Sequence, residues 1–318
     1  MTLIPAGQRV PDGDSAEELF AGSLQTLKLW PLRRLEEKPL HSRGGQRVFK
    51  AFLVDRKVVW LKDVESDAEN RGYRRLRALS DWTNHLVPWL ECVPTSPGRF
   101  LVVTPDHGSP FSSQPVDVLA RQLAQLMLRC GSRPEKQEWL PAYELLARRN
   151  LHAHLHLDRR PWPTFVDDLL RKFLERLSHL QFAYSTHQHG DLTLSNLRFW
   201  ADDWGVIDYS TAIDDLPAFI DAARLEISWL TRVVQRRLAL VDIQRFYRSL
   251  FAGTLPSACP LLMPLAQPWS ADPQFIALKI ARCIHLFDCS TCPRDRAFLT
   301  EVLILHLSAQ AGGLCATD

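Results

Sequence analysis

The sequence contains no hydrophobic run long enough to cross a bilayer. Its most apolar late segment, FLTEVLILHLSA at 298–309, is interrupted by polar residues and is shorter than the roughly 20 apolar residues that a spanning helix requires. The first residues, MTLIPAGQRVPDGDSAEE, also lack the basic start and apolar core of a signal peptide. We therefore expect a protein with no transmembrane segment.

Charge of one sign is not in excess either. The 38 lysines and arginines against 36 aspartates and glutamates leave a net charge of +2, so nothing global favours nucleic acid or an anionic membrane as a partner. The seven cysteines are scattered, without the spacing of a disulfide framework, which favours a reducing compartment and a cytoplasmic location. With 318 residues, 46% of them hydrophobic, the chain can bury one large core or two modest ones.

The first third of the chain is rich in strand patterns. Apolar residues recur at helical spacing in 15–30, which predicts an amphipathic helix there. Strand-like runs follow at 48–54 and 57–62, joined by a turn and preceded by the flexible SRGG. A helix is expected from Asp67 onward, and two more strands flank the Pro-Gly turn in TSPGRF. This pattern predicts a small β-rich lobe with one helix.

The rest of the chain is mainly helical in pattern, beyond a Pro- and Gly-rich segment. Helices are expected at 114–130, 136–149, 164–183 and, with a break at 255–273, across 216–312. Thr164 is expected to cap the third of them, and LRFW and GVIDY form a β-pair within 197–209. The expected fold class is α+β. Its expected parts are an N-terminal helical extension (1–30), an N-lobe (31–104), a hinge (105–110) and a larger, mainly helical C-lobe (111–318).

Three oxygen-bearing side chains stand on predicted loops of the larger lobe. Asp191 follows His189 and Gly190 after a long predicted helix, where a carboxylate can face a substrate hydroxyl. Asn196 lies five residues later, and Asp208 ends the run GVID. Phosphoryl transfer needs a positioned hydroxyl and a metal that neutralises phosphate charge, and oxygen ligands of this kind suit Mg²⁺. The pattern therefore predicts Asp191 beside an acceptor, and Asn196 with Asp208 on a metal.

The stretch HGDLTLSNLRFW…GVIDYS, with its H-G-D-x-x-x-x-N spacing, resembles the catalytic and metal loops of the aminoglycoside phosphotransferase and choline kinase group. These are protein-kinase-like enzymes that phosphorylate small molecules. The resemblance implies a two-lobed protein-kinase-like fold and Mg²⁺-dependent transfer of the γ-phosphate of ATP or GTP to a hydroxyl of a sugar, an aminoglycoside or a similar molecule. It implies Asp191 as the catalytic base or hydroxyl-positioning residue, and Asn196 and Asp208 as Mg²⁺ ligands. Ser210 departs from the group, which often carries a second acidic residue there.

The same resemblance assigns nucleotide-binding residues to the smaller lobe. Lys62 resembles the strand lysine that contacts the nucleotide phosphates, and Glu69 resembles the helix glutamate that pairs with it, with Glu65 as the alternative. The other implied positions lie in the phosphate-covering loop, Ser42, Gly44 and Gly45, and in the strand and hinge beside the adenine, Thr104, Asp106 and His107. Pro105 has no N–H, so its neighbours would have to supply the backbone donors. Asp221 resembles a structural aspartate that follows the metal loop.

Other interpretations stay open at this point. The three loop residues would then be solvated turn residues, Lys62 an exposed strand end and Glu69 a first-turn acid favoured by the helix dipole. A pseudokinase that serves as a scaffold fits the seven-residue spacing of Lys62 and Glu69 and the Asp-Tyr-Ser metal loop. A protein kinase is disfavoured, because no activation segment ending in A-P-E follows Asp208.

The sequence does not decide the nature of the acceptor. Six arginines lie within 224–248: Arg224, Arg232, Arg236, Arg237, Arg245 and Arg248. They would favour an acidic acceptor if they faced the site, and would otherwise form a solvated helix face. Asp214 and Asp215 would instead attract a cationic acceptor. Lipopolysaccharide core-sugar kinases share this lobe plan, and a lipid-linked sugar acceptor would bring peripheral contact with a membrane.

Cysteine and histidine gather in CIHLFDCSTC at 283–292. On a continuous helix His285, Cys289 and Cys292 would share one face, as three metal ligands would. The alternative is that Cys283 and its neighbours are small fillers of a buried helix.

Overall fold

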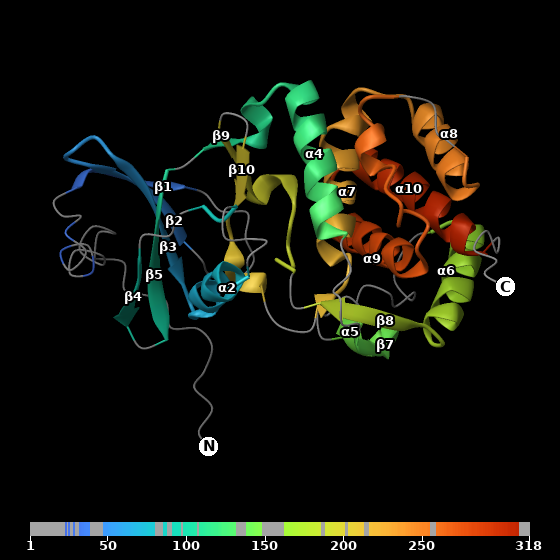
Figure 1. Ribbon diagram of the computed structural model, residues 1–318, viewed down its shortest axis with the longest axis horizontal. Coiled ribbons are helices and arrows are strands. Elements are labelled where there is room, and N and C mark those ends of the chain that lie inside the picture. Colours follow the sequence, from blue (N-terminus) through green and yellow to red (C-terminus); the bar gives the residue numbers. More distant parts are fainter. Residues whose placement is uncertain are drawn as a thin grey trace, which may run out of the picture. The chain divides into compact units, whose positions relative to one another are not determined.

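The structure is a computed structural model that describes residues 23, 25, 28, 32–38, 47–79, 85–87, 91–96, 98–106, 108–131, 138–147, 162–185, 188–200, 203–212, 216–254 and 259–311. These residues form two compact units (Figure 1). One unit takes its residues from Met1–Arg71 and Val87–Gly108, and the other from Gly72–Leu86 and Ser109–Asp318. Nearly all of the predicted N-terminal helix lies outside the described residues, and the predicted lobe and hinge limits stay predictions.

The first unit is built on one antiparallel sheet of five strands in the order β1-β2-β3-β5-β4. The strands are β1 (Leu32–Lys38), β2 (Arg47–Leu53), β3 (Val58–Val64), β4 (Glu91–Ser96) and β5 (Arg99–Pro105). Both predicted hairpins are present: β2 turns into β3 at Arg56, and β4 turns into β5 at Gly98, whose φ of 77° suits glycine. The helix expected from Asp67 is α2 (Ala68–Arg77).

The two faces of this sheet carry different side chains. Phe49, Leu61 and Val103 belong to a core with fully buried side chains on one face. Successive residues of a strand point to opposite faces, so Lys62, which pairs with Val48 and Val102, belongs to the other face. This alternation explains how Lys62 stands beside the fully buried Leu61 in the same strand.

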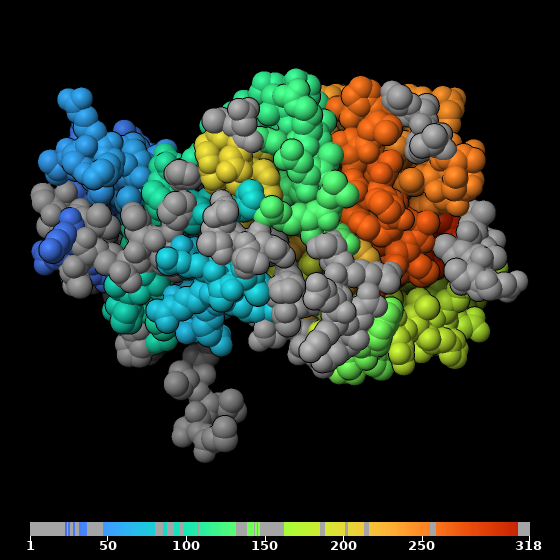
Figure 2. All heavy atoms as spheres, viewed as in Figure 1, coloured from blue at the N-terminus to red at the C-terminus, as the bar shows by residue number. Residues whose placement is uncertain are grey.

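The second unit is mainly helical. Its helices are α4 (Val116–Cys130), α5 (Ala142–Ala147), α6 (Thr164–Leu177), α7 (Ile220–Arg232), α8 (Leu240–Phe251), α9 (Pro273–Cys289) and α10 (Pro293–Ala311). Most residues of α7 are buried, because it packs between α4 and α9 (Figure 1). On the face shown in Figure 2, α4 in green and the orange segment that includes α9 cover much of this unit. No helix in the described part of the chain is both long and apolar enough to span a bilayer.

Two small sheets complete the second unit, in the strand orders β10-β9-β6 and β11-β8-β7. Their strands are β6 (Ser109–Pro110), β7 (Glu138–Pro141), β8 (Gln181–Ser185), β9 (Leu197–Trp200), β10 (Asp203–Val206) and β11 (Leu216–Pro217). Among the short 3₁₀ helices of the described residues, η3 (Leu194–Asn196) and η4 (Tyr209–Thr211) bear on the site. Of the predicted pair, LRFW is β9, whereas β10 begins at Asp203 and ends at Val206, so it includes only the first two residues of GVIDY.

Two of the helix predictions are wrong. The helix expected at 136–149 is instead β7 followed by the short α5, because β7 pairs with β8. The helix expected at 164–183 ends at Leu177, because the residues that follow form β8. Thr164 is the first residue of α6, and Pro163 holds the cap position without a side-chain hydrogen bond. Pairing between distant strands here overrides the local helical pattern.

A charged pair lies inside the helical core. Lys279 Nζ on α9 is 2.9 Å from Glu226 Oε1 on α7, and both side chains are fully buried. The hydroxyl of Tyr247 donates to the same oxygen at 2.5 Å. Burial lowers the pKa of Lys279, although the nearby Glu226 acts in the opposite direction. The pair fixes α7 against α9 at one point along both helices.

Candidate functional site

One carboxylate holds the loop that carries Asp191. Asp221 Oδ2 accepts the N–H of His189 at 2.5 Å, while Oδ1 accepts those of Gly190 at 2.8 Å and Leu192 at 3.2 Å. The Asp221 side chain is fully buried. Burial raises its pKa, although the N–H donors act in the opposite direction. Asp221 thus does what the resemblance implies for a structural aspartate.

The imidazole of His189 braces the same loop. Its Nδ1 accepts the N–H of Asp191 at 3.3 Å, and its Nε2 donates to the carbonyl of Ile207 at 3.1 Å. These contacts fit a neutral ring with its proton on Nε2. The hydroxyl of Thr211 donates to the His189 carbonyl at 3.0 Å. The loop is therefore joined to the chain on both sides of Asp208.

The hairpin of β9 and β10 brings Asn196 and Asp208 to one end of the ladder. Leu197 pairs with Val206 in the ladder. At the next position outward, the N–H of Ile207 donates to the carbonyl of Asn196 at 2.9 Å. Asp208 follows directly, so the register of this hairpin sets the closeness of Asn196 and Asp208.

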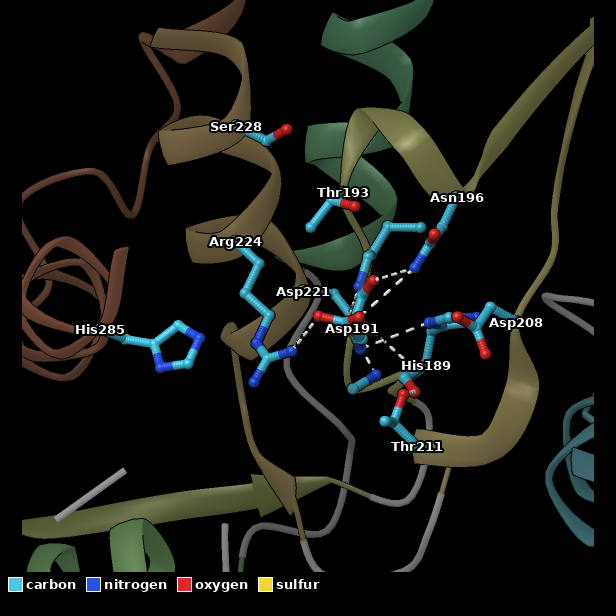
Figure 3. Close-up of polar contacts among 12 residues, drawn as sticks. His189, Asp191, Thr193, Asn196, Asp208, Thr211, Asp221, Arg224, Ser228 and His285 are labelled. Atoms are coloured by element: carbon cyan, nitrogen blue, oxygen red, sulfur yellow. Dashed lines mark hydrogen bonds and ion pairs between the residues drawn. The ribbon is translucent and has the colours of Figure 1, made fainter. Parts of the chain in front are cut away.

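Asp191 lies between an amide and a guanidinium (Figure 3). Asn196 Nδ2 donates to the backbone carbonyl of Asp191 at 2.8 Å and lies 3.5 Å from its Oδ2. On the other side, Arg224 of α7 forms a close ion pair with Asp191 Oδ1. The Arg224 side chain is 13% exposed and that of Asp191 is 33% exposed. The carboxylate is therefore held in place but remains accessible to a ligand.

Asn196 and Asp208 offer oxygen atoms suited to a hard cation. The amide nitrogen of Asn196 donates to Asp191, whereas its amide oxygen makes none of the hydrogen bonds among the described residues. Asp208 has φ 67° and ψ 72°, a left-handed conformation that is strained for a residue other than glycine and concentrates at functional positions. Its Oδ1 accepts the Ser210 hydroxyl at 3.2 Å. An amide and a carboxylate oxygen fit Mg²⁺ in the nature of the donors.

The chain immediately after Asp208 packs against the part of α2 that belongs to the second unit, at Gly72 and Tyr73. A Cβ atom at Gly72 would lie 1.8 Å from the carbonyl oxygen of Tyr209, so no larger residue fits there without a shift of the backbone. The ring of Tyr209 lies 5.1 Å from that of Tyr73, and its hydroxyl donates to the Val206 carbonyl at 2.5 Å. The position of this loop is thus fixed by packing as well as by hydrogen bonds.

In the first unit, Lys62 and Glu69 form an ion pair. Lys62 Nζ lies 2.8 Å from Glu69 Oε2, with side chains 18% and 5% exposed. The seven-residue spacing is sufficient because α2 begins only four positions after the end of β3. Glu65, the alternative partner, lies 3.6 Å from Arg99 instead. The pairing is observed, and its role toward a nucleotide stays a prediction.

The residues predicted beside the adenine are only partly described. The N–H of Asp106, expected to be a free donor, instead donates to the Val58 carbonyl at 2.9 Å. The reason is that pairing with β3 continues one residue beyond Pro105. The Asp106 carboxylate accepts Trp60 Nε1–H at 2.8 Å and pairs with Lys50 at 3.0 Å. Thr104 is the ladder partner of Trp60. The remaining predicted positions, Ser42, Gly44, Gly45 and His107, lie outside the described residues.

The arginines of 224–248 separate into two kinds. Arg224 alone is among the site residues, and the other five are exposed, which corresponds to the solvated helix face. Arg282 stands on α9, which packs on the α7 helix that carries Arg224, and the sequence alone does not single it out. A signal was present: on a helix Arg282 shares a face with His285 and Cys289, which were considered as metal ligands only.

The described residues contain no group of three Cys, His, Asp or Glu side chains that could hold a metal. In CIHLFDCSTC, Cys283 is buried, while Cys289 and Cys292 are exposed. Cys283 therefore fits a buried filler, and the other two do not. Asp214 and Asp215 lie outside the described residues.

Comparison with known proteins identifies the fold. The sequence matches no protein-family model and no curated protein. A thermostable mutant of aminoglycoside phosphotransferase APH(4)-Ia, in complex with ADP and hygromycin B, is similar in structure with a TM-score of 0.56 and 12% identity, over 92% of this chain and 99% of that one. Aminoglycoside 2'-phosphotransferase-IIIa in its GDP complex gives a TM-score of 0.52 and 12% identity, over 94% and 99% of the two chains. The predicted α+β fold, with a β-rich N-terminal region and a helical C-terminal region, is confirmed by this likeness, which at such identities is one of fold.

Proposed function

We propose that the chain is a phosphotransferase that moves the γ-phosphate of a nucleoside triphosphate to a hydroxyl of a small molecule. The observation that carries the proposal is the placement of Asp191, Asn196 and Asp208 by one loop and one hairpin that are tied together through His189 and Ile207. The fold supports it, since the similar structures are aminoglycoside phosphotransferases in complexes with ADP and hygromycin B or with GDP.

Asp191 would act on the acceptor. Its carboxylate would orient the hydroxyl and take its proton while the alcohol oxygen bonds to the γ-phosphorus and the bond from that phosphorus to the leaving diphosphate breaks. Asn196 and Arg224 restrain Asp191 from opposite sides, and such positioning supplies much of the rate in reactions of this kind.

Asn196 and Asp208 would hold Mg²⁺, which when bound neutralises charge on the phosphates. Lys62 would contact the nucleotide phosphates, and Glu69 would hold its ammonium group in place through the 2.8 Å pair. ATP and GTP are both consistent with these residues. The observed pair also removes one reason for a scaffold without activity, because the short spacing of Lys62 and Glu69 does not prevent their contact.

Nucleotide-dependent thermal stabilisation tests the proposal. AMP-PNP with Mg²⁺ should raise Tm, as any ligand that binds only the folded chain does, and Asp208→Ala should remove the part of this rise that depends on Mg²⁺. Asp191→Asn should keep the rise in Tm but lose transfer of label from γ-labelled ATP, screened over sugars, aminoglycosides and a generic protein. Normal turnover by Asp191→Asn would show that the assigned base is wrong. A rise in Tm that ignores Mg²⁺ would favour the scaffold.

A further inference from the structure

A second guanidinium, that of Arg282, stands on the helix beside α7. Arg282 projects from α9, which packs directly on the α7 helix that carries Arg224. The pKa of Arg282 is lowered to about 10, first by burial and then by the charge of Arg224, while Asp191 acts in the opposite direction. Arg282 therefore stands on the helix that packs on α7, where Arg224 forms its ion pair with Asp191.

Arg282 has no partner of its own in the described part of the chain. Its Nε is buried and lacks a hydrogen-bond acceptor, and none of the ion pairs among the described residues involves it. A buried guanidinium nitrogen without an acceptor is costly. The residue nevertheless keeps some exposure to solvent, so a ligand can reach it.

A buried ion pair fixes the part of α9 that carries Arg282. The buried pair of Glu226 and Lys279 joins α7 to α9 within one helical turn of Arg224 and Arg282. Lys279 and Arg282 stand at the i, i+3 spacing of one helix face. His285 continues that face, and in Figure 3 its ring points from α9 toward Arg224. Two arginines against one carboxylate leave an excess of positive charge.

From this cluster we infer that the acceptor alcohol carries an anionic group, a phosphate or a carboxylate, which Arg282 binds together with Arg224 while the hydroxyl lies at Asp191. The inference rests on the proposed function and specifies its acceptor. An anion would supply the acceptor atoms that Arg282 lacks, and charge-assisted bonds of arginine to such groups are among the strongest polar contacts. A cationic acceptor would instead add a third positive charge beside two guanidinium groups.

Titration with inorganic sulfate, in the presence of saturating AMP-PNP and Mg²⁺, tests this directly. Wild type should bind sulfate, and Arg282→Gln should weaken binding by about tenfold or more, the loss expected for one charge-assisted bond. Arg282→Lys should fall between them. Arg294→Gln, which removes an exposed arginine at the start of α10, is the matched control and should bind like wild type. The melting temperature without ligand checks that each variant folds.

A second arm compares matched acceptors: glucose, glucose 6-phosphate, glucuronate and glucosamine with γ-labelled ATP. Preference for the phosphate or for the carboxylate distinguishes the two anionic groups, and Arg282→Gln should lower kcat/KM for that acceptor while sparing glucose. If none of the four is turned over, the sulfate titration alone decides.

Three results overturn the inference: sulfate binding that ignores Arg282, a preference for glucosamine, or sulfate binding that is present with ADP and vanishes with AMP-PNP. The last result would assign the arginines to the γ-phosphate. If AMP-PNP fails to bind while sulfate still depends on Arg282, the anion site stands and the proposed function fails.

Discussion

The loop that carries Asp191 should depend on the carboxylate of Asp221, and two substitutions there should differ in cost. Asparagine can keep a carbonyl oxygen at the Oδ1 position, which accepts the N–H groups of Gly190 and Leu192. Its NH₂ group would then face the N–H of His189, which loses its acceptor. Alanine would leave all three N–H groups without an acceptor in a site where Asp221 is fully buried.

The magnitudes follow from the number of orphaned donors. One buried N–H without a partner costs about 1–3 kcal/mol, and a neutral side chain recovers part of the burial cost that raises the pKa of Asp221. We therefore expect Asp221→Asn to lower the free energy of unfolding by about 1–2 kcal/mol and Asp221→Ala by about 3–5 kcal/mol.

Urea denaturation at pH 7 measures both values, and hydrogen exchange of the segment around His189–Leu192 gives a local readout that should rise in the same order. Asp168→Asn is the control, because Asp168 is exposed and its 3.5 Å contact with Arg171 is a surface pair, worth at most about 1 kcal/mol. Equal losses for Asn and Ala, or a loss below about 1 kcal/mol for Ala with unchanged exchange, would refute the reasoning.

Three further outcomes are expected. Lys62→Ala should weaken AMP-PNP binding at least tenfold in a thermal-shift titration, since it removes a charge-assisted phosphate contact. Lys57→Ala, at an exposed strand end, is the control and should not weaken it. Equal effects of the two substitutions would show that Lys62 is not part of the nucleotide site. Lys279→Met should lower the free energy of unfolding by about 3–5 kcal/mol, because it leaves the buried Glu226 without its partner. Adding Glu226→Leu should restore most of that free energy in urea denaturation. A double variant no more stable than Lys279→Met would contradict this. The pKa of His306 is well below 6.5 through burial, so below about pH 6.5 only the unfolded chain takes up this proton, and stability should fall by about 1.4 kcal/mol per pH unit. His306→Gln should flatten the wild-type loss between pH 6.5 and 5, measured by urea denaturation at each pH, and an unchanged slope would show that His306 also titrates when folded.

Local patterns predicted the elements that position the site. The hairpin of β2 and β3 and that of β9 and β10 join strands that are neighbours in the chain, so alternation and turn residues were enough to locate them. The pairing of Lys62 with Glu69 was also within reach, because both lie at the junction of one strand and one helix.

Contacts between distant segments were not accessible in this way. Pairing of β7 with β8 replaced two helical patterns by strands. The ladder beyond Pro105 used the Asp106 N–H that a nucleotide was expected to need. Arg282 is brought to the side of Arg224's helix only through the packing of α9 on α7, which no periodicity within either helix determines.

The bare Cα of Gly72 has a mechanical consequence. Because Tyr209 O occupies the space where a Cβ would stand, α2 cannot turn about its own axis without driving Tyr73 or another side chain into the peptide that follows Asp208. A displacement of α2 at Gly72 would therefore also displace that peptide, and a spectroscopic label on an exposed residue of α2 after Gly72 would report it.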